Sequence, residues 1–285
     1  MQQFNNLKKG VPVFLLLVLS IQWSFSQKYS NEFLSIGLSA RAQAMGNSFV
    51  ASVDDVTAGF WNPAALASID MSKGIQIGAK HAEWFGGVGK YDYLGLAIPF
   101  DDHKRAFGVS MIRFGIDDIP NTLSLYEDDG SVNYDNIKPF SAADYAFLFS
   151  YAQKVHTDRG ELFLGGNVKV VHRSIGPFAK SWGFGLDASV KYHLGKWKFG
   201  ALLKDISNTF NAWSFNFTED EKVILDLTDN TIPIKSLEVT RPQIILAAAR
   251  KFDFGKVGLT AELDMNMFMD GKRNTLISSY PFSLD

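Results

Sequence analysis

The chain has 285 residues and a formal charge of −2; 46% of its residues are hydrophobic, 20% are charged, and none is cysteine. The hydrophobic content excludes a disordered chain, and the balanced charge provides no basic surface for nucleic acid. Without cysteine there are no disulfides, thiolate metal sites or cysteine nucleophiles. Stability must therefore come from burial of apolar groups, in water or in lipid.

Residues 1–26 have the pattern of an export signal. Lys8 and Lys9 precede an apolar run over residues 11–21, and small residues precede a cleavage site at Gln27. The run is shorter than the roughly 20 apolar residues that a spanning helix needs. We therefore expect a signal peptide and a mature protein that leaves the cytoplasm.

Beyond this segment the dominant pattern is alternation. From Gly183 to Leu194, every second residue starting at Phe184 is apolar, whereas the residues between them are small, polar or charged. A period of two predicts a strand with a different environment on each face. About nine such segments recur, each near the ~10 residues of a tilted membrane strand, with a tenth candidate at Thr275. They begin near Gly74, Tyr91, Arg105, Ala142, Glu161, Gly183, Trp197, Pro242 and Val257.

The connections favour a membrane barrel over a soluble sandwich. Short connections at 101–104 and 156–160 alternate with long ones at 115–141 and 207–241. Outer-membrane barrels have tight periplasmic turns and longer extracellular loops, whereas a sandwich has no reason to separate its connections in this way. The sequence therefore predicts an all-β fold, an antiparallel transmembrane β-barrel over residues 74–285.

Aromatic residues cluster near the predicted strand ends, as they do at the headgroup level of a bilayer. They are Tyr91, Tyr93, Phe100, Phe114, Tyr145, Tyr151, Tyr192 and Trp197. Together their positions favour an interfacial girdle, whereas any single one of these rings is better explained by ordinary packing.

Residues 27–73 are too irregular for strands and too apolar for a solvated linker. Asp54 or Asp55 can cap a short helix, and Asn62 followed by Pro63 is an N-cap with proline at the first helical position. This segment is expected to be a compact hatch of short helices inside the barrel.

Several runs carry a resemblance to a known family. They are Ala44-Met45-Gly46-Asn47, Val53-Asp54-Asp55-Val56-Thr57-Ala58, Trp61-Asn62-Pro63-Ala64-Ala65-Leu66, Ile116-Asp117-Asp118-Ile119-Pro120-Asn121-Thr122 and Phe210-Asn211-Ala212-Trp213-Ser214-Phe215. The first three resemble the hatch of FadL-type outer-membrane barrels, within them the PorV/PorQ branch of the type IX secretion system. The last two resemble a PorV-like subgroup, and the likeness covers essentially all of the mature chain.

The resemblance implies a 14-stranded barrel, more than the nine or ten strands that alternation predicts. An open sheet edge in lipid leaves unpaired backbone groups that cost several kcal/mol each, so closure is required. We therefore expect a barrel that is incomplete at the C-terminus, with a smaller closed barrel as the alternative.

No motif predicts catalysis, a metal or a cofactor. The five histidines lack metal-ligand spacing, and no nucleophile elbow, phosphate loop or His-Glu-x-x-His motif occurs. The acidic runs at 117–118 and 127–130 do not match a calcium loop. His193 is expected to face a solvated lumen beside Lys191 and Asp187.

The resemblance implies an integral outer-membrane component of a Gram-negative type IX system that docks or shuttles cargo. Its partners would be the C-terminal signal domains of secreted cargo, translocon and attachment-complex proteins, and outer-membrane lipid. The expected docking residues lie in the two long connections: Asp117, Asp118, Pro120, Asn121, Phe210, Asn211, Trp213 and Phe215. Any one of these side chains could equally cap its own barrel.

A FadL-like channel for fatty acids or other hydrophobic compounds is the alternative. Such a channel needs an apolar conduit, but the residues of the expected inner face are mostly Gly, Ser, Asp, Lys, Asn and Thr. Phe49, Val50, Phe60 and Trp61 of the hatch could nevertheless build a small pocket.

Overall fold

The computed structural model describes residues 30–70, 72, 74–102, 104–127, 129–230, 235–269, 275–277 and 280–282. The predicted signal peptide, residues 1–26, lies outside the described residues. No helix in these ranges is long and apolar enough to cross a membrane.

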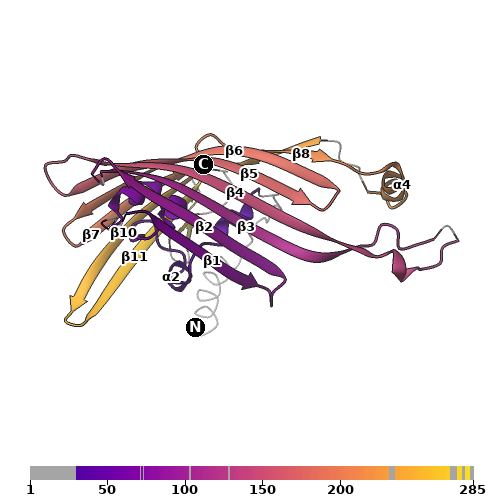
Figure 1. Ribbon diagram of the computed structural model, residues 1–285, viewed down its shortest axis with the longest axis horizontal. Helices are drawn as coiled ribbons and strands as arrows, with labels where there is room; N and C mark the ends of the chain where they lie inside the picture. Colours follow the sequence, from indigo (N-terminus) through magenta and orange to yellow (C-terminus); the bar gives the residue numbers. More distant parts are fainter. Residues whose placement is uncertain are drawn as a thin grey trace, which may run out of the picture.

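Eleven antiparallel strands form one sheet, which confirms the predicted all-β class (Figure 1). The strands are β1 (Gln76–Trp84), β2 (Gly89–Phe100), β3 (Arg105–Asn121), β4 (Lys138–Val155), β5 (Glu161–Ile175), β6 (Ala179–Leu194), β7 (Trp197–Lys204), β8 (Thr209–Phe215), β9 (Lys235–Thr240), β10 (Gln243–Phe254) and β11 (Val257–Phe268). The order is β1 to β7, then β10 and β11, while β8 pairs with β6 and β9. The described sheet is open, with β1 and β11 at the ends of the main path and β9, which pairs with β8 alone, as a further edge strand. Two short strands, β12 (Thr275–Ile277) and β13 (Tyr280–Phe282), pair separately.

The expected long loop over 207–241 contains two strands and a helix, α4 (Glu219–Leu227). The expectation that 210–215 are loop residues is wrong, because β7 is too short to cover β6. Strand β7 pairs only with residues 188–194 of β6. Strand β8 pairs with residues 179–184, near the other end of β6.

Residues 117–121 were also expected in a loop, and they too belong to a strand. A register shift between Ile116 and Ile119 interrupts the pairing of β3 with β4, which then resumes as far as Asn121. Such a bulge bends the strand without ending it. The β3–β4 hairpin therefore extends beyond its neighbours, as Figure 1 shows.

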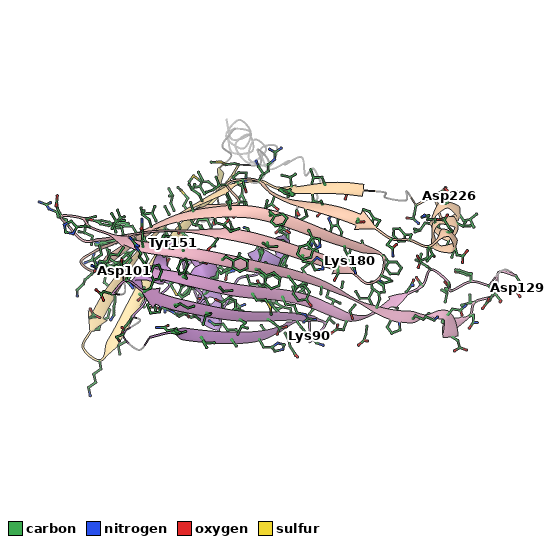
Figure 2. All side chains as sticks on the ribbon, turned by 45° about the horizontal axis from the view of Figure 1, so that its top comes forward. Lys90, Asp101, Asp129, Tyr151, Lys180 and Asp226 are labelled. Carbon is green, nitrogen blue, oxygen red and sulfur yellow. The ribbon has the colours of Figure 1, made fainter. Side chains whose placement is uncertain are left out.

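The predicted separation of short and long connections is confirmed only in part, because the connections from β1 to β2 and from β5 to β6, at the end expected to carry the long loops, are also short. Tight turns join β2 to β3, β4 to β5, β6 to β7 and β10 to β11 at one end of the sheet. At two of them Gly195 and Gly255 have φ of 59° and 67°, which tight hairpin turns require. The opposite end carries the β3–β4 extension, which includes the 3₁₀-helix η3 (Tyr134–Asn136), and the β8–α4–β9 segment. Figure 2 labels Asp101 and Tyr151 near the first end, and Asp129 and Asp226 at the second.

The two faces of the sheet differ as the alternation predicts. On β6, Phe184 and Leu186 are exposed on one face, whereas Asp187, Ser189 and Lys191 are buried on the other. We call the face with exposed apolar residues the outer face. The opposite, inner face is covered by the N-terminal segment.

The N-terminal segment, residues 30–70, contains η1 (Glu32–Ser35), α2 (Ala40–Ala44), α3 (Ala58–Trp61) and η2 (Pro63–Ser68). Apolar residues of this segment form one core with alanine, aliphatic and aromatic residues of β2 to β5. Asp55 is not the N-cap residue of α3, which is Thr57. Instead, Asp55 Oδ1 accepts a hydrogen bond from Thr57 N at 2.8 Å. Pro63 begins η2 as predicted, but the Asn62 side chain makes no capping bond.

Candidate functional site

Two carboxylates of β11 hold the N-terminal segment against the inner face. Glu262 Oε1 accepts hydrogen bonds from the backbone N–H groups of residues 51 and 52, at 2.7 and 3.3 Å. Asp264 Oδ2 accepts from those of residues 49 and 50, at 3.0 and 3.3 Å. This role could not be predicted from the sequence, because the bonded groups are backbone atoms more than 200 positions away.

The Asn-Pro-Ala run joins the N-terminal segment to β6. Asn62 Nδ2 donates to Val50 O at 2.9 Å and to Val190 O at 3.3 Å, so it ties a turn of the segment to the strand. Ala64 N donates to Ser189 Oγ at 2.8 Å. Asn62 therefore anchors the segment instead of capping a helix.

Close approach to β5 completes this anchor. A Cβ placed at Gly165 would lie only 2.4 Å from Ala64 N and 2.7 Å from Pro63 C. Glycine is therefore required where the backbone of η2 packs on the sheet.

The other residues predicted for the hatch make contacts within the N-terminal segment. Asp54 Oδ1 accepts from Arg41 Nη1 at 2.6 Å, in a surface ion pair. The buried Trp61 donates from Nε1 to Leu38 O at 3.1 Å, and its ring lies edge-on to Phe49 at a centroid distance of 5.9 Å.

An ion cluster is buried between the sheet and this segment. Lys169 Nζ on β5 donates to Asp187 Oδ1 at 3.1 Å and to Asp205 Oδ1 at 2.6 Å. Lys191 Nζ donates to Val53 O at 2.5 Å. The expectation that Lys191 and Asp187 line a solvated lumen is wrong, since the N-terminal segment covers both. His193 lies farther along β6, partly buried.

Tyr91 and Tyr93 were expected in an interfacial girdle, but both point inward. The Tyr91 hydroxyl donates to Phe33 O at 3.0 Å, and the Tyr93 hydroxyl donates to Val56 O at 2.8 Å. Their alternation places them on the covered face, so these rings anchor the N-terminal segment.

The start of the described N-terminal segment is held by β8 and β9. Asn211 Nδ2 donates to Ser30 Oγ at 2.6 Å and to Asn31 Oδ1 at 2.9 Å, and Asn31 Nδ2 donates to Thr240 Oγ1 at 3.0 Å. Asn211 is fully buried. It therefore contributes to internal packing, not to a freely accessible loop.

Trp213 is buried on the same inward side of β8, with 7% of its surface exposed, and the Arg173 guanidinium lies over its ring at 5.2 Å. Phe215 stacks beside Trp213 at 6.3 Å, and Phe210 faces outward.

The two predicted docking groups, residues 117–121 on β3 and 210–215 on β8, are not brought together, because three strands separate β3 from β8. In the first group, Asp117 Oδ2 accepts from Lys90 Nζ at 2.8 Å.

Other members of that first group shape the backbone. Asp118 has a φ of 57°, Pro120 pairs with Pro139, and Asn121 Oδ1 accepts from Leu123 N at 3.0 Å. They set the geometry of the extension where it leaves the sheet.

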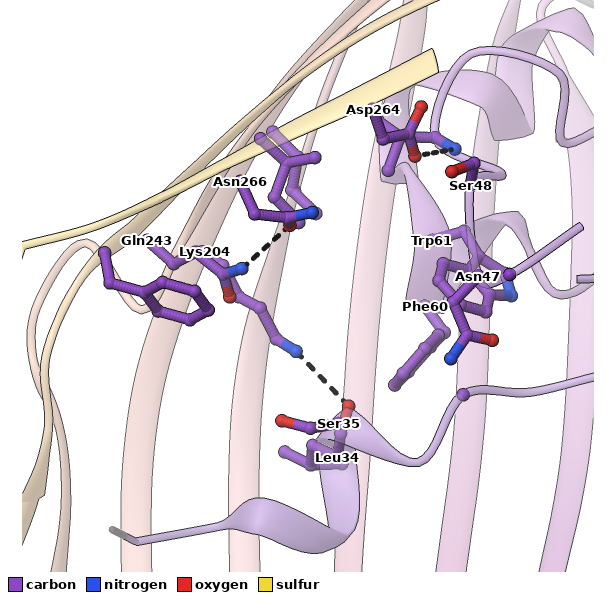
Figure 3. Close-up of a pocket in the computed structure, with 16 residues that line it drawn as sticks. Leu34, Ser35, Asn47, Ser48, Phe60, Trp61, Lys204, Gln243, Asp264 and Asn266 are labelled. Atoms are coloured by element: carbon purple, nitrogen blue, oxygen red, sulfur yellow. Dashed lines mark hydrogen bonds between the residues drawn. The ribbon is translucent and has the colours of Figure 1, made fainter. Parts of the chain in front are cut away.

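A pocket of 250 Å³ lies between the N-terminal segment and strands β7, β10 and β11 (Figure 3). Val50, Phe60 and Trp61 line it, as expected for three of the four hatch residues, whereas Phe49 is buried away from it. Polar groups complete the lining, among them Lys204, whose Nζ donates to Leu34 O at 3.4 Å. The pocket can accept a small ligand that has both an apolar part and a hydrogen-bond acceptor.

The outer face changes character along register rows that cross the strands. One row is amphipathic: His81, Asp92, Arg113, Tyr145, His172 and Trp182, each paired with the next. A second row lies two residues closer to the tight turns on each strand, and all its members are apolar: Ala79, Leu94, Met111, Phe147, Val170, Phe184, Phe210 and Val239. A third row lies two residues closer to the extensions, and its members are small, polar or charged: Glu83, Lys90, Gly115, Ala143, Ser174, Lys180 and Ser214. We call the amphipathic row, from His81 to Trp182, the boundary row and the third row the polar row.

Neighbouring side chains of the boundary row interact. Arg113 donates from Nη1 to Asp92 Oδ2 at 3.1 Å and from Nε to the Tyr145 hydroxyl at 3.3 Å. The rings of His172 and Trp182 stack at a centroid distance of 4.2 Å. Tyr145, one of the rings predicted for the girdle, lies in this row, whereas its charged neighbours Asp92 and Arg113 could not have been identified from aromatic residues in the sequence.

Beyond the boundary row, the extensions expose apolar side chains. Tyr126, Val132 and Tyr134 are exposed on the β3–β4 extension, as are Val223 and Leu227 on α4. These five side chains are called the exposed patch residues.

Both extensions are ordered by their own polar contacts. On α4, Thr218 and Glu221 form a capping box. On the β3–β4 extension, Asn133 and Asn136 donate to Glu127 Oε1 at 2.7 and 3.0 Å, which lowers the pKa of that carboxyl below its usual value.

Within the described ranges, no group of three or more His, Cys, Asp or Glu side chains could hold a metal ion. Comparison with protein-family models finds no match, and comparison with curated proteins finds none either.

Proposed function

We propose that this chain is an outer-membrane β-barrel component of a type IX secretion system that docks or shuttles secreted cargo between the translocon and the attachment machinery. The observation that carries the proposal is the boundary row, where an apolar outer face gives way to polar residues across consecutive strands. In water such a face would be an unusually large exposed apolar surface. In a bilayer it matches hydrocarbon on one side of the row and headgroups on the other.

The height of the apolar face supports a bilayer. On β6 it runs from Trp182 to Tyr192, both on the outer face. Ten residues at about 3.3 Å each, tilted by about 40° as in membrane barrels, span about 25 Å. That height equals the apolar band of outer-membrane barrels, and an aromatic ring stands at each end of it.

The barrel in this proposal is closed around the N-terminal segment, which acts as a hatch. The β1 and β11 edges both need a pairing strand, because each unpaired backbone group in hydrocarbon costs several kcal/mol. The tight turns would face the periplasm and the two extensions the cell exterior.

Docking is assigned to the exposed patch residues, not to the inward Trp213. Aromatic and aliphatic side chains that protrude from ordered extensions favour contact with another protein. Resemblance to PorV-like proteins makes the C-terminal signal domain of exported cargo the occupant we propose.

Site-specific photocrosslinking in native outer membranes tests this function. A photoreactive residue at Tyr134 or Leu227 is expected to capture secreted cargo, while one at Thr260 on the inner face of β11 serves as the control. Fractionation of the protein away from the outer membrane, or equal capture from all three positions, would contradict the proposal.

A FadL-like channel is a second candidate, favoured by the pocket in Figure 3. Its apolar residues Phe60 and Trp61 lie near Lys204, an arrangement suited to a short amphipathic acid. Deletion of the gene separates the two candidates: loss of growth on long-chain lipid with secretion intact would favour the channel, whereas loss of secretion alone would favour docking.

A further inference from the structure

A cavity of 640 Å³ opens between β6 and β8 at the boundary row. Lys180 and Trp182 line it from β6, and Ser214 and Asn216 line it from the end of β8. Lys180, Trp182 and Ser214 belong to outer-face positions of their strands. The cavity therefore combines an indole in the boundary row with a cation, a hydroxyl and an amide on the polar side of that row.

Lys180 differs from the other cations at this height. Lys90, in the same register row, pairs with Asp117 at 2.8 Å, and Arg113 in the boundary row pairs with Asp92 at 3.1 Å. Within the described part of the chain, no carboxylate pairs with Lys180. Its charge is thus available to an anion from outside the protein. Figure 2 labels Lys90 and Lys180 near the same end of the sheet.

Below Lys180, the outer face offers an apolar path. Trp182 is 54% exposed although His172 stacks on one side of its ring, and Phe184 and Leu186 continue along β6 with exposed side chains. An indole at the headgroup level with aliphatic and aromatic residues beneath it suits an acyl chain.

We propose that Lys180, Trp182, Ser214 and Asn216 form a binding site for the phosphate of an anionic lipid. The phosphate lies against the Lys180 ammonium, with Ser214 and Asn216 as hydrogen-bond donors, and the acyl chains run over Trp182 and Phe184. A lipid phosphate is favoured over a free phosphate because the exposed apolar side chains of Phe184 and Leu186 follow Trp182 along the outer face of β6. The site rests on the proposed membrane location of this face.

Native mass spectrometry of the purified full chain in neutral detergent tests the site, with phosphatidylglycerol and phosphatidylcholine as probes. The unaltered protein should retain phosphatidylglycerol preferentially. Lys180→Gln should weaken that binding by about fivefold, the effect of one Lys near an anionic headgroup, and Lys180→Arg should restore it. Lys90→Gln is the matched control, since Lys90 lies in the same row but is already paired, and it should leave the preference unchanged.

Three results would overturn the site: no preference for phosphatidylglycerol, an equal effect of Lys90→Gln and Lys180→Gln, or competition by inorganic phosphate at the same concentration as the lipid. Flotation with vesicles of pure phosphatidylcholine is a separate measurement of membrane insertion. Flotation without a lipid preference would remove this site alone, whereas failure to float would remove the membrane location on which it rests.

Discussion

Lys169 donates a hydrogen bond to Asp205 at 2.6 Å, although the lysine side chain is only 1% exposed. Asp187 accepts a second bond from the same ammonium. The Lys169–Asp205 ion pair joins β5 to the residue that follows β7, on the inner face of the sheet. Without the Lys169 ammonium, two carboxylates would be buried close together with no cation between them to compensate their charge.

Lys169→Met is therefore expected to destabilise the protein strongly. Removal of one partner from a buried ion pair typically costs about 3–5 kcal/mol. Lys154→Met is the control, because its pair with Glu161 is exposed and such pairs contribute about 0–1 kcal/mol. Urea unfolding in vesicles measures both; equal midpoints would mean that Lys169 is not held as a buried ion.

Glu262→Gln and Asp264→Asn should loosen the N-terminal segment. Each change weakens an acceptor of two backbone N–H groups, and such hydrogen bonds contribute about 0.5–3 kcal/mol each. Trypsin should then cleave faster after Arg41, which is exposed in α2. Asp253→Asn at the β10–β11 turn is the control, and the same cleavage rate in all three variants would contradict the anchor.

Much of the sheet can be predicted from the sequence, because the two faces of each long strand have different environments, so that apolar side chains alternate with small, polar or charged ones. The outer positions of β6 from Phe184 onward illustrate this. In contrast, β8 and β9 are short, and their pairing depends on the part of β6 that β7 leaves uncovered. No local pattern contains that information.

The inner contacts could be predicted only in part. The Asn-Pro-Ala run signals a special structure, but Asn62 bonds to a strand 128 positions away. Likewise, Lys191 and Asp187 fit the pattern of a solvated lining equally well. Only the position of the N-terminal segment decides that they are buried.

Trp213→Ala should disturb β8 and β9 from within. The substitution removes a buried indole and its contact with Arg173, and replacement of a buried Trp by Ala costs about 3–5 kcal/mol. Amide hydrogen exchange over residues 209–217 should accelerate, whereas Phe210→Ala, on the outer side of the same strand, should change it less. Unchanged exchange together with lost cargo capture would instead assign Trp213 to direct docking.

The proposed membrane location of the outer face predicts that the cost of a charged substitution depends on its depth. Leu186→Arg places a charge within the apolar band and should cost about 2–4 kcal/mol, whereas Ser174→Arg lies in the polar row beyond the boundary row and should cost about 0–1 kcal/mol. Both sites are on the outer face of neighbouring strands, so the comparison isolates depth from the added charge. Unfolding in vesicles, followed by heat-dependent gel migration, measures the difference. Equal costs would mean that this face is covered by something other than hydrocarbon, because only a depth-dependent dielectric separates the two arginines.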